Sequence, residues 1–260
     1  MRAEPRRLLE IALEVSVPIL LLVIWGLWSS GSDTYYFPPL TEILETFADT
    51  WVFERVGSDV VPSLVRMGVG YGIAVVVAVS TGLLLGLSAR ARTSAAPIVE
   101  FLRAIPPPAL LPFAILVIGV GNSMKVFIIA FVCVWPILLN TIDGVMGVDP
   151  TLQDTTRVYG VSKRDRLWNV MLPAASPQIF AGMRTSLSLA LIMMVISEMV
   201  ASTNGIGYFV LQSQRTFAIP EMWSGILLLG ILGYTLNGAF VLIERRVLRW
   251  HRGARASALG

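Results

Sequence analysis

Residues 68 to 87 of the chain read GVGYGIAVVVAVSTGLLLGL and contain no charged side chain. An α-helix rises 1.5 Å per residue, so about 20 apolar residues match the roughly 30 Å hydrocarbon core of a bilayer. A helix also makes all its backbone hydrogen bonds internally, as a segment in lipid must. The stretch therefore predicts a transmembrane helix, and its spaced glycines Gly82 and Gly86 predict close packing against another helix.

Blocks of the same kind recur along the chain of 260 residues. We place spans near Val15–Trp28, Gly68–Leu87, Pro97–Val120, Val126–Val145, Gln178–Ala201 and Trp223–Leu242. Hydrophobic residues make up 55% of the chain and charged residues only 14%, against about 25% charged in a soluble domain. The predicted fold is an all-α membrane protein of about six transmembrane helices. We expect a single domain over residues 1–260, in which residues 1–65 supply the first helix and an external connector.

The N-terminal run begins with arginines, as a signal peptide does. It is too long for one, Glu10 and Glu14 interrupt its start, and no small-residue cleavage pattern follows. We therefore expect a retained first helix. The acidic segment after it is predicted to hold a short surface helix, and it is either a solvated connector or a contact for an external partner.

Positive charges predict the orientation, because Lys and Arg are retained on the cytoplasmic side of short loops. One side of the spans collects Arg2, Arg6, Arg7, Arg90, Arg92, Arg157, Lys163, Arg164, Arg166, Arg245, Arg246, Arg249, Arg252 and Arg255. The other side holds only Arg55, Arg66, Lys125 and Arg215. Both termini are therefore predicted to be cytoplasmic. Topology also explains the formal net charge of +3 more simply than a nucleic-acid partner would.

The residue inventory speaks against an enzyme. Cys133 is the only cysteine and His251 the only histidine, so neither a histidine metal site nor a Ser/His/Asp triad can be assembled. A phosphate-binding loop of the form G-x-x-x-x-G-K-[ST] is absent as well. We expect no catalytic residue, metal or cofactor in this chain, and any energy from ATP must enter through a separate subunit.

The polar segment Gly147 to Pro177 predicts two short helices joined at a glycine. The expected positions are Asp149 as first N-cap, Pro150 at the first helical position, Gly160 as left-handed C-terminal residue, Ser162 as second N-cap, and Leu172-Pro173 as the end of the second helix after Val170. With the predicted orientation, these two helices form a compact projection on the cytoplasmic surface. Fixed to two spans, it could pass the motion of a docked partner into the membrane.

This segment resembles the coupling loop of ABC importer permeases, whose signature is E-A-A, three residues, Gly, nine residues and I-x-L-P. The matching residues are Asp154-Thr155-Thr156, Gly160 and Val170-Met171-Leu172-Pro173. Asp for Glu keeps the acidity, Thr-Thr for Ala-Ala the small size, and Val for Ile the shape. The resemblance implies that Asp154, Thr155, Thr156, Gly160, Val170, Leu172 and Pro173 couple the chain to an ATPase.

Other stretches resemble the nitrate, sulfonate, taurine and bicarbonate permease group. They are LRAIP (102–106), LLP (110–112), GVG (119–121), AGMR (181–184), SEM (197–199), GIGY (205–208) and ERRVLRW (244–250). The resemblance covers about Arg66 to Trp250 and implies a core permease at 66–250 with the type I (MetI-like) importer fold. It also implies a homodimer in a bacterial cytoplasmic membrane, with two ATP-binding-cassette subunits that bind ATP and Mg, a solute-binding protein outside, and a small anionic substrate.

Five residues are candidates for the translocation path. Arg103, near the start of the third block, could meet an anion, but it could also snorkel to the interface or pair within the bundle. Pro106 and Pro108 predict a kinked or unwound helix, beside a path or purely structural. Ser197 and Glu198 close the fifth block. Glu198 could shape an external gate, although we favour a structural pair with an arginine.

Two other functional classes stay open at this point. A secondary transporter driven by an ion gradient would have similar spans, and it predicts uptake without ATP. A membrane-embedded enzyme or a non-catalytic assembly scaffold could also have six spans. Co-purification of an ATPase with the chain would separate an ABC permease from these alternatives.

Overall fold

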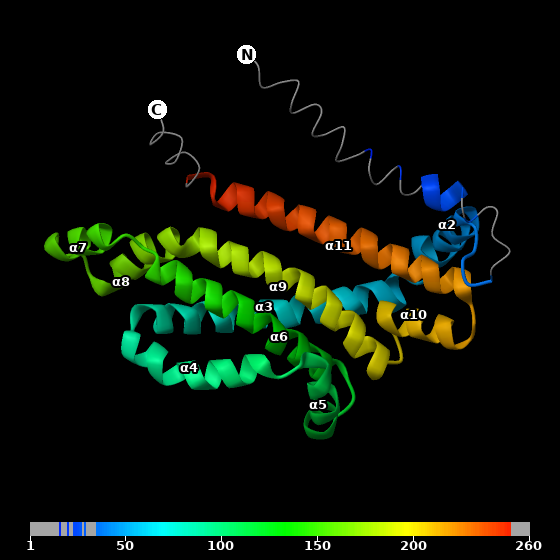
Figure 1. The fold of residues 1–260 in the computed structure, drawn as a ribbon, viewed down its shortest axis with the longest axis horizontal. Helices are drawn as coiled ribbons and strands as arrows, with labels where there is room; N and C mark the ends of the chain where they lie inside the picture. Colours follow the sequence, from blue (N-terminus) through cyan, green and yellow to red (C-terminus); the bar gives the residue numbers. More distant parts are fainter. Residues whose placement is uncertain (1–15, 17–19, 21–22, 28, 30–34, 251–260) are drawn as a thin grey trace, which may run out of the picture.

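The computed structural model describes residues 16, 20, 23–27, 29 and 35–250, and the regular structure of this part is entirely helical (Figure 1). The first part contains α2 (Leu40–Asp49), the π-helical turns η1 (Thr50–Glu54) and η2 (Val56–Val60), α3 (Val61–Leu87), α4 (Ala89–Ala104), the 3-10 turn η3 (Pro107–Ala109), α5 (Leu110–Ile118) and α6 (Asn122–Met146). It continues with α7 (Pro150–Val158), α8 (Lys163–Arg166), the π-helical turn η4 (Leu167–Met171), α9 (Leu172–Val200), α10 (Ile206–Arg215) and α11 (Ile219–Val247).

Four of the predicted spans appear as long apolar helices. The stretches long and apolar enough to cross a membrane are Val56–Leu87, Asn122–Met146, Lys163–Val200 and Ile219–Val247. They match the second, fourth, fifth and sixth predicted spans. The first predicted span, near Val15–Trp28, lies partly outside the described residues. The surface helix expected in the external segment is α2.

The third predicted span, Pro97 to Val120, is a bent pair of helices, so the predicted bounds were wrong whereas the predicted break at the prolines is present. The helix begins at Ala89, and Ala89–Ala104 meets Pro107–Ile118 at an angle of 80°. Ile105 and Pro106 are extended at the bend, because proline cannot donate a backbone hydrogen bond and disfavours helical geometry in the residue before it. The predicted kink is therefore present, and it raises the described spans to as many as five.

Close glycine contacts show that α3 and α6 run parallel. A Cβ on Gly70 would lie 2.9 Å from Ile129 Cβ, and one on Gly86 would lie 2.7 Å from Val145 Cβ. The starts of the two helices are thus at one end of the bundle and their ends at the other. Parallel neighbours need a crossing connection, and the bent pair α4–α5 returns the chain from the end of α3 to the start of α6 (Figure 1).

The long helix α9 runs back against α6. Gly144 approaches Gln178, and Gly182 approaches Asn140 with a Cβ distance of 2.7 Å, so residue numbers rise along one helix as they fall along the other. The helix α11 runs antiparallel to α9 in turn (Figure 1). Buried apolar residues of α3, α6 and α9, including Ile129 and Met194, form the main core.

The bundle therefore has two distinct ends. At one end lie the start of α3, the start of α6, the end of α9, and α10; we call it the α10 end. At the other lie the ends of α3 and α6, with α7 and α8; we call it the α7 end (Figure 1).

One prediction about the α7 end was wrong. Leu172-Pro173 does not stop the second short helix, because α8, η4 and α9 form one continuous helical stretch from Lys163 to Val200. Pro173 is placed in the first turn of α9 directly after the wider π-helical turn η4, where the missing N–H removes no regular α-helical hydrogen bond. Of the predicted loop 147–177, only the part before Lys163 lies outside this continuous stretch.

Candidate functional site

The segment between α6 and α9 is held by the caps that the sequence predicts. A side-chain oxygen of Asp149 accepts the Thr151 N–H at 2.8 Å, with Pro150 at the first helical position of α7. Ser162 Oγ accepts the Asp165 N–H at 3.1 Å and caps α8. Between the helices, Gly160 has φ +68°, a left-handed conformation that favours glycine. These contacts define residues 149–166 as an ordered unit, which we call the α7–α8 unit.

The first half of the signature lies in this unit. Asp154 is largely exposed and forms an ion pair with Arg157 at 2.9 Å. Thr155 Oγ1 donates to the Thr151 carbonyl at 2.7 Å, whereas Thr156 is buried and donates to the carbonyl of Gln153. Of the three signature positions, Asp154 and Thr155 thus face solvent and Thr156 packs inward.

The second half of the signature is half-buried where α9 begins. Val170 is in η4, and Leu172 and Pro173 open α9. Met171 between them is 2% exposed, in a cluster with Val145, Val148, Ala175 and Ile179. The α7–α8 unit is therefore joined to α9 through packed helix, so a force on the unit acts directly on a transmembrane helix.

Large apolar side chains project from the α7–α8 unit and the turn after it. Val158 is 85% exposed, Tyr159 82% and Trp168 58%. Exposed apolar groups that gather on one element mark contact surfaces more often than scattered ones do. These residues were not predicted from the sequence, because an apolar residue near a short helix is expected to be buried until its exposure is known.

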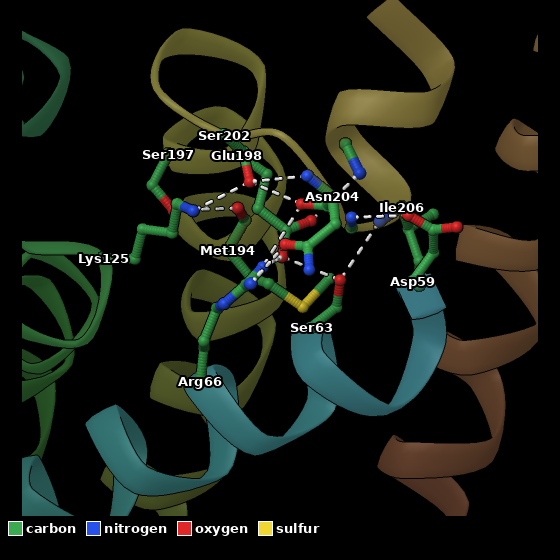
Figure 2. A network of polar contacts seen from close by, with 12 residues as sticks. Asp59, Ser63, Arg66, Lys125, Met194, Ser197, Glu198, Ser202, Asn204 and Ile206 are labelled. Atoms are coloured by element: carbon green, nitrogen blue, oxygen red, sulfur yellow. Dashed lines mark hydrogen bonds and ion pairs between the residues drawn. The ribbon is translucent and has the colours of Figure 1, made fainter. Parts of the chain in front are cut away.

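The α10 end carries a buried ion pair between two spans. Arg66 of α3 and Glu198 of α9 approach to 2.8 Å, and their side chains are 6% and 0% exposed (Figure 2). Glu198 Oε1 also accepts the Ser63 hydroxyl at 2.7 Å, and Oε2 accepts the Gly207 N–H at 3.0 Å. A carboxylate this buried needs such donors to satisfy its two oxygens. Glu198 thus has the arginine partner that we favoured for it.

Arg66 uses its remaining donors to join further elements. Its Nε donates to Asn122 Oδ1 at 2.8 Å, and Nη1 donates to the carbonyl of Asn204 at 3.3 Å. Nη2 donates to the side chain of Asn204. One guanidinium therefore links α3 to the start of α6, the end of α9 and the turn before α10. Figure 2 shows Arg66 with Glu198 and Asn204.

Two side chains near the start of α3 also bind the backbone of the turn before α10. Asp59 Oδ1 accepts the Gly205 N–H at 2.7 Å, and Ser63 Oγ accepts the Ile206 N–H at 3.1 Å. Gly205 has φ +116°, and a Cβ there would lie 2.4 Å from Glu198 Cδ. The position therefore needs glycine both for its backbone conformation and for the space that the carboxylate fills.

A hollow of about 730 Å³ opens beside this network. It is lined by Arg66, Ile115, Val120, Gly121, Asn122, Lys125, Val200, Ala201, Ser202, Thr203 and Asn204. Two of these side chains are basic and none is acidic. Glu198 is not among the lining residues, and its carboxylate is paired with Arg66.

The structure separates the predicted path residues into two groups. Arg103, Pro106 and Pro108 lie at the bend between α4 and α5, where Arg103 is exposed and pairs with Glu100 at 2.6 Å. Ser197 and Glu198 lie at the end of α9, and Ser197 donates to the carbonyl of Met194. None of the five lines the hollow, so the structure does not bring them together into one site.

The residues that the sequence did not select are the partners of Glu198 and the basic lining of the hollow. Arg66 and Lys125 were visible only as two of the few cations on the side with low positive charge. That scarcity was a usable signal, because the few cations on the side with low positive charge are candidates for a specific interaction. Ser63, Asn122 and Asn204 carried no signal, since their roles depend on which helices meet.

Residues 70–249 match the model of one protein family, the binding-protein-dependent transport system inner membrane component. The chain belongs to this family. It is thus an ABC importer permease, a multi-pass membrane subunit whose role is transport rather than catalysis, and this settles the class for which the sequence left alternatives open.

Curated relatives agree with this membership. The permease is 31% identical to the nitrate import permease protein NrtB of Synechocystis over 88% of this chain and 86% of the relative. It is 30% identical to the bicarbonate transport system permease protein CmpB of Synechococcus elongatus over the same shares, and 28% identical to SsuC of Bacillus subtilis, named for aliphatic sulfonates transport, over 90% and 86%.

The fold agrees with a solved structure of the MetNI methionine ABC transporter in an inward-facing conformation. The TM-score is 0.66 at 21% identity, covering 73% of this permease and 94% of that chain. This likeness confirms the expected MetI-like fold.

Proposed function

We propose that this permease forms the path for a small oxyanion and that a separate ATPase drives it by docking on the α7–α8 unit. The observation that carries the proposal is the build of that unit: both of its helices are capped, and α8 continues into α9. The unit exposes Val158 and Tyr159, and Trp168 is exposed in the turn η4 that follows it. A rigid unit with an apolar surface suits a partner that pushes on a transmembrane helix. A flexible loop would absorb the same motion.

The substrate class rests on two independent lines. Relatives at about 30% identity are named for nitrate and bicarbonate, and one at 28% for aliphatic sulfonates; each name denotes an oxyanion. The hollow at the α10 end has a basic lining and no acidic one, which attracts anions. Selection among nitrate, bicarbonate and sulfonates is assigned here to a solute-binding protein.

The proposed assembly follows the family. It contains two copies of the permease, two ATP-binding-cassette subunits that hold ATP and Mg, and an extracytoplasmic solute-binding protein, all at a bacterial cytoplasmic membrane. The α7 end is assigned to the cytoplasm by its arginines and lysines, which places the α10 end outside.

Replacing Gly160 tests the coupling. In Gly160→Pro the new ring cannot adopt φ +68° and removes the N–H that donates to the Arg157 carbonyl at 3.0 Å. We expect the variant to insert and bind its ATPase, and hydrolysis to continue while ATP-dependent anion uptake into proteoliposomes falls at least about tenfold, the loss expected when about 1.4 kcal/mol of coupling disappears.

Gly238→Ala in α11 is the control, because nothing lies within 4 Å of the added Cβ. Wild-type uptake by Gly160→Pro would contradict the coupling role. Uptake that persists without ATP would contradict the ATPase-driven mechanism and favour an ion gradient.

A further inference from the structure

Lys125 stands out among the described residues at the α10 end as a buried cation that forms no ion pair. It lies in the first turn of α6, is 3% exposed, and its Nζ donates to Ser202 Oγ at 2.8 Å (Figure 2). Within residues 35–250 it forms no other hydrogen bond and no ion pair. Arg66 nearby differs, because Glu198 neutralises it at 2.8 Å.

The contact with Ser202 orients Lys125 but does not neutralise it. The Ser202 hydroxyl donates its own hydrogen to the carbonyl of Asn204, so it can only accept from the ammonium. An ammonium has three N–H donors, which leaves two of them for another acceptor. A desolvated cation without a counterion is costly, so an acceptor with negative charge would be held strongly.

The hollow adds positive potential around this ammonium. Gly121 and Asn122, where α6 begins, line it together with Lys125, and no described side chain caps the start of that helix. A helix N-terminus carries partial positive charge on free N–H groups. Thr203 adds a hydroxyl to the lining.

The nearby carboxylates are already bound by other donors. Glu198 is bound by Arg66, Ser63 and the Gly207 N–H, and Asp59 by the Gly205 N–H and Ser58. Both lie outside the lining of the hollow. The hollow, at about 730 Å³, is within the size range of small-molecule sites.

We propose that Lys125 is the anchor of an oxyanion site in this hollow, with Thr203 and the first-turn amides of α6 as further donors. The ligand is a small monovalent oxyanion such as nitrate or an alkanesulfonate. The inference rests on the proposed function in one respect: it takes the bound anion to be the transported solute, held at the α10 end of the path.

The test measures anion binding to the purified full-length permease complex in detergent. The probe is trifluoromethanesulfonate, whose fluorine NMR line broadens when it binds a large particle, in a buffer with gluconate as the only other anion. We expect broadening that nitrate and ethanesulfonate reverse. Trifluoroethanol is the uncharged control, and adding nitrate should leave the width of its fluorine line unchanged.

Substitutions at Lys125 locate the site. Lys125→Gln should weaken binding at least about tenfold, because a charge-assisted hydrogen bond is lost, while Lys125→Arg should keep it within about threefold of wild type. Arg215→Gln, which removes an exposed cation from the same end, should bind as wild type. Size-exclusion profiles and thermal midpoints show whether each variant is folded.

Two results would overturn the site. Equal binding by folded Lys125→Gln and wild type would do so, as would a loss of binding in Arg215→Gln equal to that in Lys125→Gln. ATP-driven uptake separates the two proposals: if binding depends on Lys125 but proteoliposomes import no oxyanion with ATP, the site stands and the proposed function fails. If import occurs while Lys125→Gln binds and imports as wild type, the function stands and the site fails.

Discussion

At the scale of single residues, the Arg66–Glu198 pair brings two buried charges together. Both side chains are desolvated, so their favourable contact is offset by the cost of removing two charges from water. The cost becomes visible when one partner is removed, since the other is then a buried charge without compensation. Ser63, Asn122 and Asn204 fill the remaining hydrogen-bonding positions, which is why the pair is tolerated between helices.

A double-mutant cycle measures this coupling. Arg66→Met and Glu198→Gln should each destabilise the protein, with Arg66→Met at about 3–5 kcal/mol because it leaves Glu198 charged and unpaired. The double variant should cost clearly less than the sum of the two, since no lone charge remains. Unfolding in mixed detergent micelles with increasing dodecyl sulfate, followed by tryptophan fluorescence, provides the free energies. Strictly additive effects would show that the two groups do not interact.

At the scale of elements, the packing of α3 on α6 depends on glycine. A Cβ on Gly82 would lie 2.6 Å from Thr141 Cβ, and Gly70 and Gly86 make similarly close approaches. Without side chains at these positions the two helices pack with their backbones close, as small residues allow in membranes. The same helix has Gly72 on another face, where nothing lies within 4 Å.

This difference predicts opposite outcomes for one substitution. Gly82→Ala should destabilise by about 1–3 kcal/mol, because the added methyl group forces the helices apart. Gly72→Ala should be neutral or stabilising by up to about 1 kcal/mol, since alanine favours the helix and meets no neighbour. Both are measured by unfolding in mixed micelles. A loss in Gly72→Ala as large as in Gly82→Ala would contradict the close contact.

The junction of α8, η4 and α9 is the second informative element. Pro173 and Pro177 would each break an ordinary helix interior, yet the stretch from Lys163 to Val200 is continuous. The π-helical turn η4 precedes Pro173 and shifts the hydrogen-bond pattern there. The continuity makes α8, the second helix of the α7–α8 unit, an extension of α9.

At the scale of the whole molecule, the two ends of the bundle lie one helix length apart and carry different kinds of side chains. The α7 end has an exposed unit with apolar side chains, and the α10 end has a buried charge network and a basic hollow. The helices α6 and α9 connect the two ends directly. A movement imposed at α7–α8 therefore reaches the Glu198 end of α9 through a single continuous helix.

Orientation in the membrane is the property of the whole molecule that the distribution of charge predicts. Single cysteines placed at Val158 and at Arg215 report on the two ends, and both positions are exposed. The native Cys133 is fully buried and should not react. With a membrane-impermeant maleimide, Arg215→Cys should be labelled on intact cells or spheroplasts, and Val158→Cys only after lysis. The reverse pattern would overturn the cytoplasmic assignment of the α7 end.

The sequence by itself determined the class of the fold and the local shape of the α7–α8 unit. Bilayer thickness requires long apolar helices, and capping acts between neighbouring residues such as Asp149 and Thr151, so both can be read from a single chain. It also showed that the helix near Pro106 is broken, because the effect of proline is local. Neither the angle of that break nor the continuous helix past Pro173 could be predicted from the sequence. Proline permits several backbone conformations, and packing in the bundle decides which one is adopted.

Only the tertiary structure decided the site at the α10 end. Glu198 was visible as a carboxylate at the end of a span, but its partner Arg66 lies 132 residues away, and no local rule joins them. The hollow with Lys125 likewise depends on how α6, α9 and the turn before α10 meet. Spans and caps arise from short-range physics that acts along the chain, whereas a buried charge network exists only where helices distant in sequence pack together.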